Sequence, residues 1–309
     1  MKSIDPIYSK KIQGDKPVAP IDSSTVILTR DANSGQFEIL LMQRHFKQNF
    51  MGGAYVFPGG MKEDADCDKD LINHIYGLKP EDASLLLQET YLSDEIALGL
   101  FFTAIRETFE EARILLACTS SGRPLDFAEE EVTQRFNLYR QKLIQNELSL
   151  KELAEKEAIL YTLDILIPYS HWITPEIESK RFNTRFFLAR LPQGQKSFHD
   201  GQEMTNSIWI TPDKALKQHK SGRIVLMPPT LKTIIELNNY DSTEQLYRSQ
   251  KDRRIDIILP QAFVENNRRG VKLPHDPDYT IDIYKQPPRS GEPSRIVMID
   301  GKWAAEQID

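Results

Sequence analysis

The apolar and polar positions near the start of the chain predict a β-hairpin. Residues 25–29 are rich in β-branched side chains, and residues 37–43 form a second apolar run. The segment 31–35 between them contains Asp, Asn, Ser and Gly, which favour turns. A short third strand is expected over residues 53–57, and the Pro-Gly-Gly sequence at 58–60 should end it.

A long amphipathic helix is predicted from Asp94 to about Ala117. Ser93 is a suitable N-cap, and the two acidic residues after it lie where the helix dipole favours negative charge. One face of this helix is apolar and can pack on a sheet; its residues are Ile96, Leu100, Ala104, Ile105, Ala112 and Leu115. Residues 127–156 are dense in Glu, Lys, Gln and Leu and are also expected to be helical.

The rest of the chain mixes strands and helices without a clear linker, so we expect one elaborated α/β domain. Strands are predicted within 165–191, at 207–210, at 255–259 and at 296–299, and helices at 214–220 and 230–238. The expected parts are an extended arm at 1–22, a main domain at 23–245, and a C-terminal extension at 246–309 packed on the same domain.

Composition and charge narrow the function classes. The 309-residue chain has a net charge of −6, which argues against a protein whose main role is to bind a nucleic-acid backbone. No apolar run approaches the roughly 20 residues that a membrane helix needs, so no membrane partner is expected. Cys67 and Cys118 are too few for a disulfide framework, which favours a reducing, cytoplasmic setting. No secretory signal is expected at the start, and the last residues differ from a Ser-Lys-Leu peroxisomal signal.

Three acidic side chains share one face of the long predicted helix. Glu107, Glu110 and Glu111 lie at positions i, i+3 and i+4, where like charges repel one another. A cluster of hard oxygen ligands suits Mg²⁺ or Mn²⁺. Arg106 is placed to pair with Glu110 one turn further on. The alternative interpretation is a solvent-exposed acidic face, which is common on Glu-rich helices.

A glycine-rich segment follows the third predicted strand. Gly59 and Gly60 permit backbone conformations closed to other residues and let a carbonyl approach a ligand closely. Taken alone, a Pro-Gly-Gly sequence is an ordinary tight turn. Together with the acidic helix face, it favours a functional site.

These two segments resemble the Nudix box, Gly-x5-Glu-x7-Arg-Glu-U-x-Glu-Glu-x-Gly-U, in which U is an apolar residue. Gly60 matches the first glycine and Ile114 the last apolar position. Residues 106–107 match the Arg-Glu pair, and residues 110–111 match the Glu-Glu pair. The family binds metal and diphosphate with this loop–helix–loop.

The resemblance implies roles for the matching residues. Glu110 and Glu111 would bind Mg²⁺ or Mn²⁺ with the help of the Gly60 carbonyl. Glu107 would activate water or complete the metal shell, and Arg106 would orient it. With metal bound, water is acidified and the charge of a diphosphate is neutralised.

The match departs from the box in three places. Only the x5-Glu-x7 spacing should separate the first glycine from the arginine, whereas residues 61–105 intervene here. The upstream glutamate, counted back from the arginine, falls on Leu98 and is absent. Arg113 replaces the closing glycine, so a left-handed helix cap is expected to be lost. Residues 61–92 are therefore expected as an insertion in the box, and residues 127–158 as a second, helical insertion.

An interrupted box also marks a branch of Nudix hydrolases that includes the peroxisomal coenzyme A diphosphatase. This chain resembles that branch over about residues 23–280; similar stretches are 51–60, 94–98, 171–176, 181–187, 226–231 and 273–279. The resemblance implies a Nudix α/β/α sandwich with a mixed sheet. It also implies hydrolysis of coenzyme A or an acyl derivative to 3′,5′-ADP and a 4′-phosphopantetheine species.

Further residues are candidates for the same site. Glu203 lies in a polar loop where many Nudix enzymes supply another catalytic glutamate. Arg44, Arg181 and Arg185 lie on or beside predicted strands, and arginine suits bidentate phosphate recognition. Gly59 is a further expected substrate contact. The alternatives are a plain polar loop for the glutamate and surface charge for the arginines.

Two other functions stay open at this point. One is a Nudix hydrolase that acts on ADP-ribose or a dinucleotide. The other is a degenerate Nudix module that binds a ligand or a protein without turnover. Arg113 and the missing upstream glutamate favour it, and the intact glutamates of the helix oppose it. In the leading interpretation the partner is a small nucleoside diphosphate, and the expected assembly is a homodimer.

Overall fold

The structure is a computed structural model that describes residues 18–32, 35–46, 52–196, 204–251, 253–265 and 268–308. It divides into two compact units. The larger unit contains residues 23–170 and 185–255, and the smaller unit contains 171–184, the region from 256 onward and the described residues up to 22.

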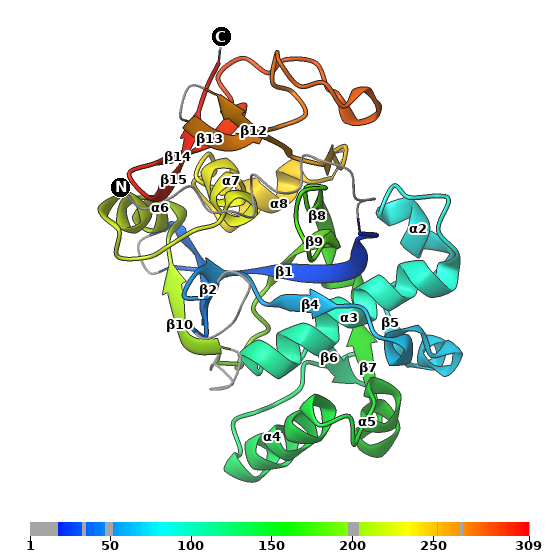
Figure 1. Ribbon diagram of the computed structural model, residues 1–309. Helices are drawn as coiled ribbons and strands as arrows, with labels where there is room; N and C mark the ends of the chain where they lie inside the picture. Colours follow the sequence, from blue (N-terminus) through cyan, green and yellow to red (C-terminus); the bar gives the residue numbers. More distant parts are fainter. Residues whose placement is uncertain are drawn as a thin grey trace. The chain divides into compact units, whose positions relative to one another are not determined.

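A mixed sheet forms the centre of the larger unit, as the α/β prediction requires (Figure 1). Strands β1 (Ile21–Asp31) and β2 (Phe37–Arg44) form the predicted antiparallel hairpin, with Thr29 opposite Ile39. The strand order is β10-β2-β1-β9-β8. The other bounds are Ile167–Ile173 for β8, Phe182–Arg190 for β9 and Met204–Ile210 for β10.

Helices cover both faces of this sheet. Helix α3 (Asp94–Ala112) packs its apolar face on one side, where Phe101 and Phe187 lie 4.8 Å apart between ring centroids. On the other side, the Tyr247 hydroxyl of α8 (Thr243–Ser249) lies 3.1 Å from that of Thr29. Figure 1 shows α3 on one side of β1 and helices α7 (Pro228–Leu237) and α8 on the other. Burial on both faces explains why β1 and β2 are continuous apolar runs rather than alternating ones.

The Pro-Gly-Gly segment belongs to the sheet, contrary to the prediction that it only ends a strand. Strand β3 (Tyr55–Val56) pairs with β2. Strand β4 (Gly59–Met61) then pairs antiparallel with β1, with Gly60 opposite Ser24. Glycine is disfavoured in strands but is used where another backbone approaches closely, and this exception was not visible in the sequence.

Helix α3 ends five residues earlier than about Ala117, where we expected its end. Ser93 caps its start as predicted, by accepting a hydrogen bond from the Ile96 amide. Its last helical residue is Ala112, and Arg113 takes the left-handed conformation with φ 59°. The expectation that the cap would be lost is therefore wrong, because an arginine adopts the conformation that the box glycine usually supplies.

This left-handed arginine makes a stability prediction. Arg113→Gly and Arg113→Ala both remove the guanidinium and the chain that carries it, but only alanine keeps a Cβ at φ 59°. The glycine variant should therefore be more stable than the alanine variant by about 1 kcal/mol. Urea unfolding of the two variants measures the difference. Equal free energies of unfolding would show that the cap is not strained.

Both insertions contain regular structure. The 61–92 segment contains five short elements: η1 (Asp64–Cys67), η2 (Lys69–His74), β5 (Ile75–Tyr76), η3 (Pro80–Asp82) and α2 (Ala83–Leu86). The predicted 127–156 helix is two helices, α4 (Glu130–Ile144) and α5 (Leu150–Glu157). The break follows from positive φ at Asn146 and from a new N-cap at Ser149, whose hydroxyl accepts from the Glu152 amide.

Of the remaining elements, those near 214–220, 230–238, 255–259 and 296–299 were predicted, and the others were not. Strand β5 also joins a small sheet in the order β5-β7-β6. The other elements of the larger unit are β6 (Ala117–Thr119), β7 (Ile159–Thr162), η4 (Leu163–Ile165), α6 (Pro212–Ser221), α7 (Pro228–Leu237) and α8 (Thr243–Ser249). In the smaller unit, β11 (Ile257–Ile258) pairs with His171 and Trp172 of β8. A second sheet there is formed by β12 (Gln261–Glu265), β13 (Arg268–Lys272), β14 (Arg295–Ile299) and β15 (Lys302–Glu306), and η5 is Asp282–Tyr284.

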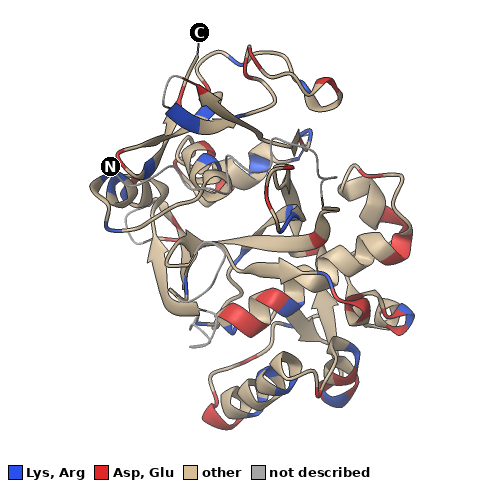
Figure 2. Ribbon diagram, viewed as in Figure 1, with Lys and Arg blue, Asp and Glu red and all other residues tan. Residues whose placement is uncertain are grey.

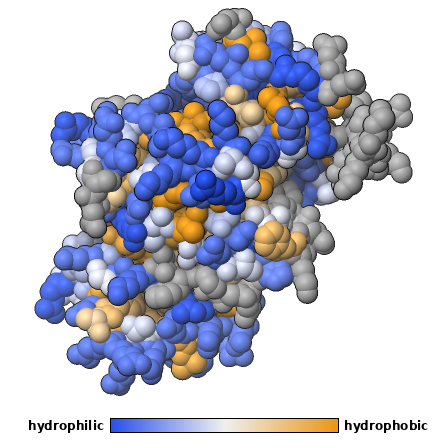
Figure 3. Space-filling view, turned by 90° about the vertical axis from the view of Figure 1, so that its left-hand side faces the viewer, coloured by the Kyte–Doolittle hydropathy of each residue, from blue (hydrophilic) through white to orange (hydrophobic). Residues whose placement is uncertain are grey.

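The described surface is mostly polar with separate apolar areas. On the face shown in Figure 3, hydrophilic residues surround several apolar patches. Exposed apolar side chains of this kind are normal when scattered. Among the helices of the described ranges, none combines the length and the apolar content needed to cross a membrane.

Candidate functional site

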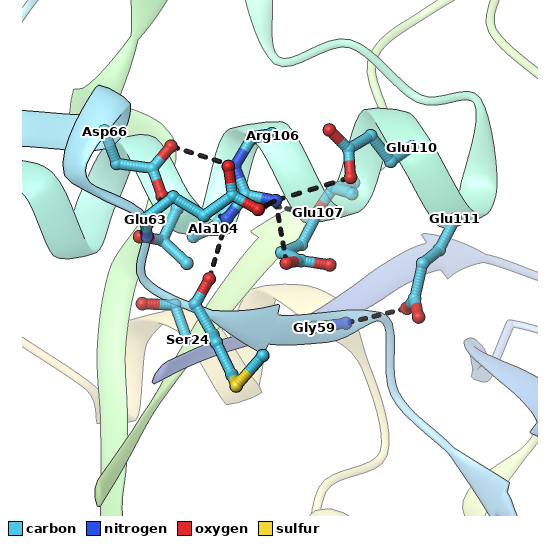
Figure 4. Close-up of polar contacts among 12 residues, drawn as sticks. Ser24, Gly59, Glu63, Asp66, Ala104, Arg106, Glu107, Glu110 and Glu111 are labelled. Carbon is cyan, nitrogen blue, oxygen red and sulfur yellow. Dashed lines mark hydrogen bonds and ion pairs between the residues drawn. The ribbon is translucent and has the colours of Figure 1, made fainter. Parts of the chain in front are cut away.

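Strand β4 brings the two glycines directly against the acidic face of α3. The Ser24 hydroxyl on β1 donates to the Leu100 carbonyl of α3 at 2.7 Å, which fixes the helix on the sheet. The Gly59 amide donates to Glu111 Oε2 at 2.9 Å (Figure 4). The glycine segment and the acidic helix face, which lie far apart in the sequence, are therefore neighbours in the fold.

The close approach of β4 to α3 on one side and to β1 on the other explains why both positions are glycine. A Cβ on Gly60 would overlap the Glu107 carboxylate. A Cβ on Gly59 would overlap the Ser24 carbonyl and Thr25. Neither glycine has a positive φ, so space rather than backbone conformation requires them. The Gly60 backbone thus lies beside a carboxylate of the acidic face.

Arg106 organises the carboxylates around it. Its side chain is 6% exposed. Nη1 donates to Glu107 Oε1 at 2.8 Å and to Glu110 Oε2 at 3.3 Å. Nη2 donates to the Met61 carbonyl beside Gly60, at 2.7 Å. The predicted pairing with Glu110 is confirmed, and one guanidinium joins β4 to two of the three acidic side chains.

Asp66 is the main partner of Arg106, and the sequence reasoning missed it. Nε and Nη2 of Arg106 each donate to the Asp66 carboxylate at 2.9 Å, and Asp66 is 2% exposed. The Thr103 hydroxyl and the Glu63 amide donate to the same carboxylate at 2.9 Å. Asp66 therefore holds the buried guanidinium with two parallel hydrogen bonds and has further donors of its own.

The spacing of the box could have identified Asp66. Counted forward from Gly60, the x5 spacing places the upstream acid at position 66, where an aspartate stands. Counting back from the arginine led to Leu98 instead and to the conclusion that this acid is absent. The interruption of the box therefore begins after residue 66, and the aspartate reaches the arginine because η1 lies against α3.

The three acidic side chains of α3 do not converge on one point. Figure 4 shows Glu107 and Glu111 extending toward β4, whereas Glu110 turns toward Arg106. Within the described ranges, no three Asp, Glu, His or Cys side chains are gathered as a ready-made metal site. The donors are nevertheless the hard oxygen ligands that suit a small divalent cation. These carboxylates are therefore suitable ligands for such a cation, provided that Glu110 leaves its contact with Arg106.

Negative charge is in excess at this end of α3. Figure 2 marks acidic residues on the last turns of the helix. Burial, together with the nearby charges of Glu107, Glu63 and Asp66, raises the pKa of Glu110 to about 8, although Arg106 acts in the opposite direction. Burial alone would lower the pKa of Arg106, but its bond to Asp66 and the charges of Glu107 and Glu110 hold that pKa above its ordinary value. One arginine does not neutralise the whole cluster.

Comparison with known proteins decides the family. The model of the NUDT19 Nudix domain matches residues 21–237. The chain belongs to the NUDT19 Nudix family. The predicted Nudix membership and the predicted enzyme class are thereby confirmed, and Nudix hydrolases in general need a divalent metal ion.

Individual relatives of this Nudix protein match most of its length. It is 26% identical to the acyl-coenzyme A diphosphatase NUDT19 of Xenopus laevis, over 87% of this chain and 83% of that protein. It is 27% identical to the human protein of the same name, over 80% of this chain and 73% of that one. A Nudix hydrolase structure from Alicyclobacillus acidocaldarius superposes with a TM-score of 0.59 at 21% identity, over 73% of this chain and 94% of the other. The likeness to that structure supports the Nudix fold.

Two other predicted site residues, Arg185 and Arg181, make contacts with other parts of the protein. Arg185 forms a buried ion pair with Glu89 at 2.7 Å, with both side chains 3% exposed, which ties the box insertion to β9. Arg181 lies in the smaller unit and donates to the carbonyls of Thr174 and Val18. These contacts are structural, so a substrate role for either arginine stays a prediction.

Arg44 and Glu203 complete the set of predicted residues. Arg44 ends β2, where its amide and carbonyl pair with Ala54 and Gly53. Its Nε is buried and has no hydrogen-bond partner among the described residues. Glu203 lies outside the described residues.

Proposed function

We propose that this Nudix hydrolase cleaves the diphosphate linkage of coenzyme A or acyl-coenzyme A, with 3′,5′-ADP and a 4′-phosphopantetheine species as products. The observation that carries the substrate class is the similarity, over at least four fifths of this chain, to two proteins named acyl-coenzyme A diphosphatase. The cluster of Glu107, Glu110 and Glu111 beside β4 supports the same reaction, because a diphosphate is bound through cations.

We propose that Mg²⁺ or Mn²⁺ is held by Glu110, Glu111 and the Gly60 carbonyl. When bound, the ion would supply positive charge to the diphosphate and lower the pKa of water. The Gly59 amide already positions Glu111. Glu110 has to exchange its 3.3 Å contact with Arg106 for the metal.

Glu107 and Arg106 are proposed to act as a pair. Arg106 holds Oε1 of Glu107 at 2.8 Å, and Asp66 in turn holds Arg106. Glu107 is 13% exposed on its side chain, so it stays within reach of water. It would either accept a proton from the attacking water or complete the metal shell. Asp66 is a positioning residue in this scheme, because it acts only through the arginine.

The substrate contacts are also proposals. Arg44 is the better supported of the predicted arginines, since its buried Nε lacks a partner among the described residues. A phosphate group would supply that partner. Gly59, Arg181, Arg185 and Glu203 remain predicted contributors to binding or catalysis. The expected homodimer also stays a prediction, which light scattering would test.

A reducing, cytoplasmic setting is proposed for the enzyme. Cys67 and Cys118 are both free thiols in the structure, and Cys118 is buried. Unpaired cysteines are typical of proteins that work where thiols stay reduced.

Metal binding should depend on pH through Glu110. Its carboxyl has a pKa of about 8 without metal, and it must lose its proton to act as a ligand. The apparent affinity for Mn²⁺ should therefore rise about tenfold per pH unit between pH 6 and 8 and level off above that. Calorimetry at pH 7 in buffers of different ionisation enthalpy should detect proton release on binding. A Glu110→Gln variant should release none, and a flat affinity profile in the wild type would contradict the assignment.

The substrate proposal is tested with matched compounds. The purified protein is given Mg²⁺ or Mn²⁺ and offered coenzyme A, 3′-dephospho-coenzyme A, ADP-ribose, NADH and diadenosine polyphosphates, and nucleotide products are separated by chromatography. The expected result is a preference for coenzyme A over the form that lacks only the 3′-phosphate. Turnover of ADP-ribose or a dinucleotide alone would reject the proposal. Binding without any product would favour a module that has lost catalysis.

A further inference from the structure

The helical insertion contacts the end of α3 that carries the proposed metal ligands. Arg140 of α4 is 4% exposed. Its Nη1 donates to the backbone carbonyl of Glu110 at 2.6 Å. This contact joins residues 30 positions apart, and it is made to the backbone of the residue whose side chain belongs to the acidic cluster.

This hydrogen bond gives the Glu110 carbonyl a donor that helix α3 itself does not provide. The last four carbonyls of an α-helix have no partner within the helix. At the end of α3, the amides of Arg113 and Ile114 donate to the carbonyls of Phe109 and Thr108. The Glu110 carbonyl is the next one along, and Arg140 supplies its donor from another element.

The charge of Arg140 also has the sign that this position favours. The C-terminal end of a helix carries partial negative charge, and a cation there is stabilising. Helix α3 has no basic residue within its last turn, and Arg113 follows at its C-cap. Helix α4 supplies a further cation, Arg140, to the Glu110 carbonyl. The last turn of α3 also carries the carboxylates of Glu110 and Glu111, which makes its position important for any metal bound there.

We propose that Arg140, supplied by α4, is a positioning residue for the metal site. By fixing the backbone of Glu110, Arg140 sets the point from which the Glu110 and Glu111 side chains reach the metal. This inference rests on the proposed metal ligands. It assigns a purpose to the 127–158 insertion, which the Nudix box does not require.

The test measures Mn²⁺ binding without substrate, by electron paramagnetic resonance of the free ion. Arg140→Met removes the donor and the charge, and it should weaken Mn²⁺ binding about tenfold, as loss of a supporting contact around a metal site commonly does. Arg140→Lys keeps a positive donor and should recover most of the affinity. If the methionine variant does not fold, Arg140→Gln is compared with the lysine variant in its place.

A control separates positioning from general support of the fold. Leu143 is buried on the same helix, and Leu143→Ala should lower the melting temperature while leaving Mn²⁺ affinity within about twofold of the wild type. Equal weakening by Leu143→Ala and Arg140→Met, or no weakening by Arg140→Met, would overturn the inference. Glu110→Gln is run beside them. If that variant binds Mn²⁺ like the wild type, the ligand assignment itself fails, independently of Arg140.

Discussion

Replacing Glu110 by glutamine is expected to lower turnover at least about 1,000-fold while the fold stays intact. Glutamine keeps the shape of the side chain but removes the negative charge that the metal requires. Loss of a metal that stabilises the transition state costs several kcal/mol, and about 4 kcal/mol corresponds to 1,000-fold in rate. Steady-state kinetics at saturating Mg²⁺ measure the effect. A rate near that of the wild type would refute the metal assignment.

The matched control is Glu95→Gln, which removes an exposed glutamate from the first turn of the same helix. It should leave turnover within about twofold, because surface substitutions away from special features have small effects.

The stability of the protein should change in the opposite direction to its activity when Glu110 is replaced. Its folded pKa of about 8 lies above the ordinary 4.5, so the stability that the neutral carboxyl contributes is full below pH 4.5 and is lost as the pH rises through 8. Without metal, Glu110→Gln should therefore gain stability relative to the wild type over that range.

Local sequence patterns predicted much of the fold because they report burial directly. The runs at 25–29 and 37–43 became β1 and β2 in the expected antiparallel pairing. A strand buried on both faces has a nearly continuous apolar sequence, which makes it easy to recognise. The N-cap at Ser93 was also correct. These features depend on residues within a few positions of one another.

The errors arose where a distant segment decided the outcome. Gly59 and Gly60 form a strand because β1 and α3 pack closely on both sides of them, which glycine's low strand propensity conceals. Arg113 adopts a left-handed conformation that is uncommon for arginine. For Arg185 the sequence offered a phosphate contact or surface charge, and neither indicated the buried ion pair with Glu89 of the box insertion. For the two glycines and for Arg185, the partner lies outside the window that a sequence pattern covers.

One part of the acidic site could be predicted from local spacing, and another part could not. The shared helix face of Glu107, Glu110 and Glu111 follows from helical spacing and needed no structure. The role of Asp66 depends on how the chain returns across an interruption of the box. Counting forward from Gly60 makes this aspartate a candidate, and the fold decides between it and a residue near Leu98, because Asp66 accepts from Arg106.

Asp66→Asn is expected to reduce both stability and activity. The change leaves the Arg106 guanidinium buried with one anionic partner fewer, and breaking a buried ion pair commonly costs about 3–5 kcal/mol. Turnover should fall about 10- to 100-fold, because Arg106 then holds Glu107 less firmly. Urea unfolding and steady-state kinetics measure the two effects. A stable variant with normal turnover would show that Asp66 does not position the arginine.

Two further variants separate the effect of the negative charge at position 66 from the effect of side-chain length. Asp64→Asn changes an exposed acid in the same 3-10 helix, and it should alter the free energy of unfolding by no more than about 0.5 kcal/mol. Asp66→Glu restores the residue type of the Nudix box at this position and keeps the charge. It should recover activity more fully than Asp66→Asn, because the Arg106 guanidinium keeps an anionic partner. If glutamate performs no better than asparagine, the two parallel hydrogen bonds require the shorter side chain, and the interruption of the box has changed the geometry around its arginine.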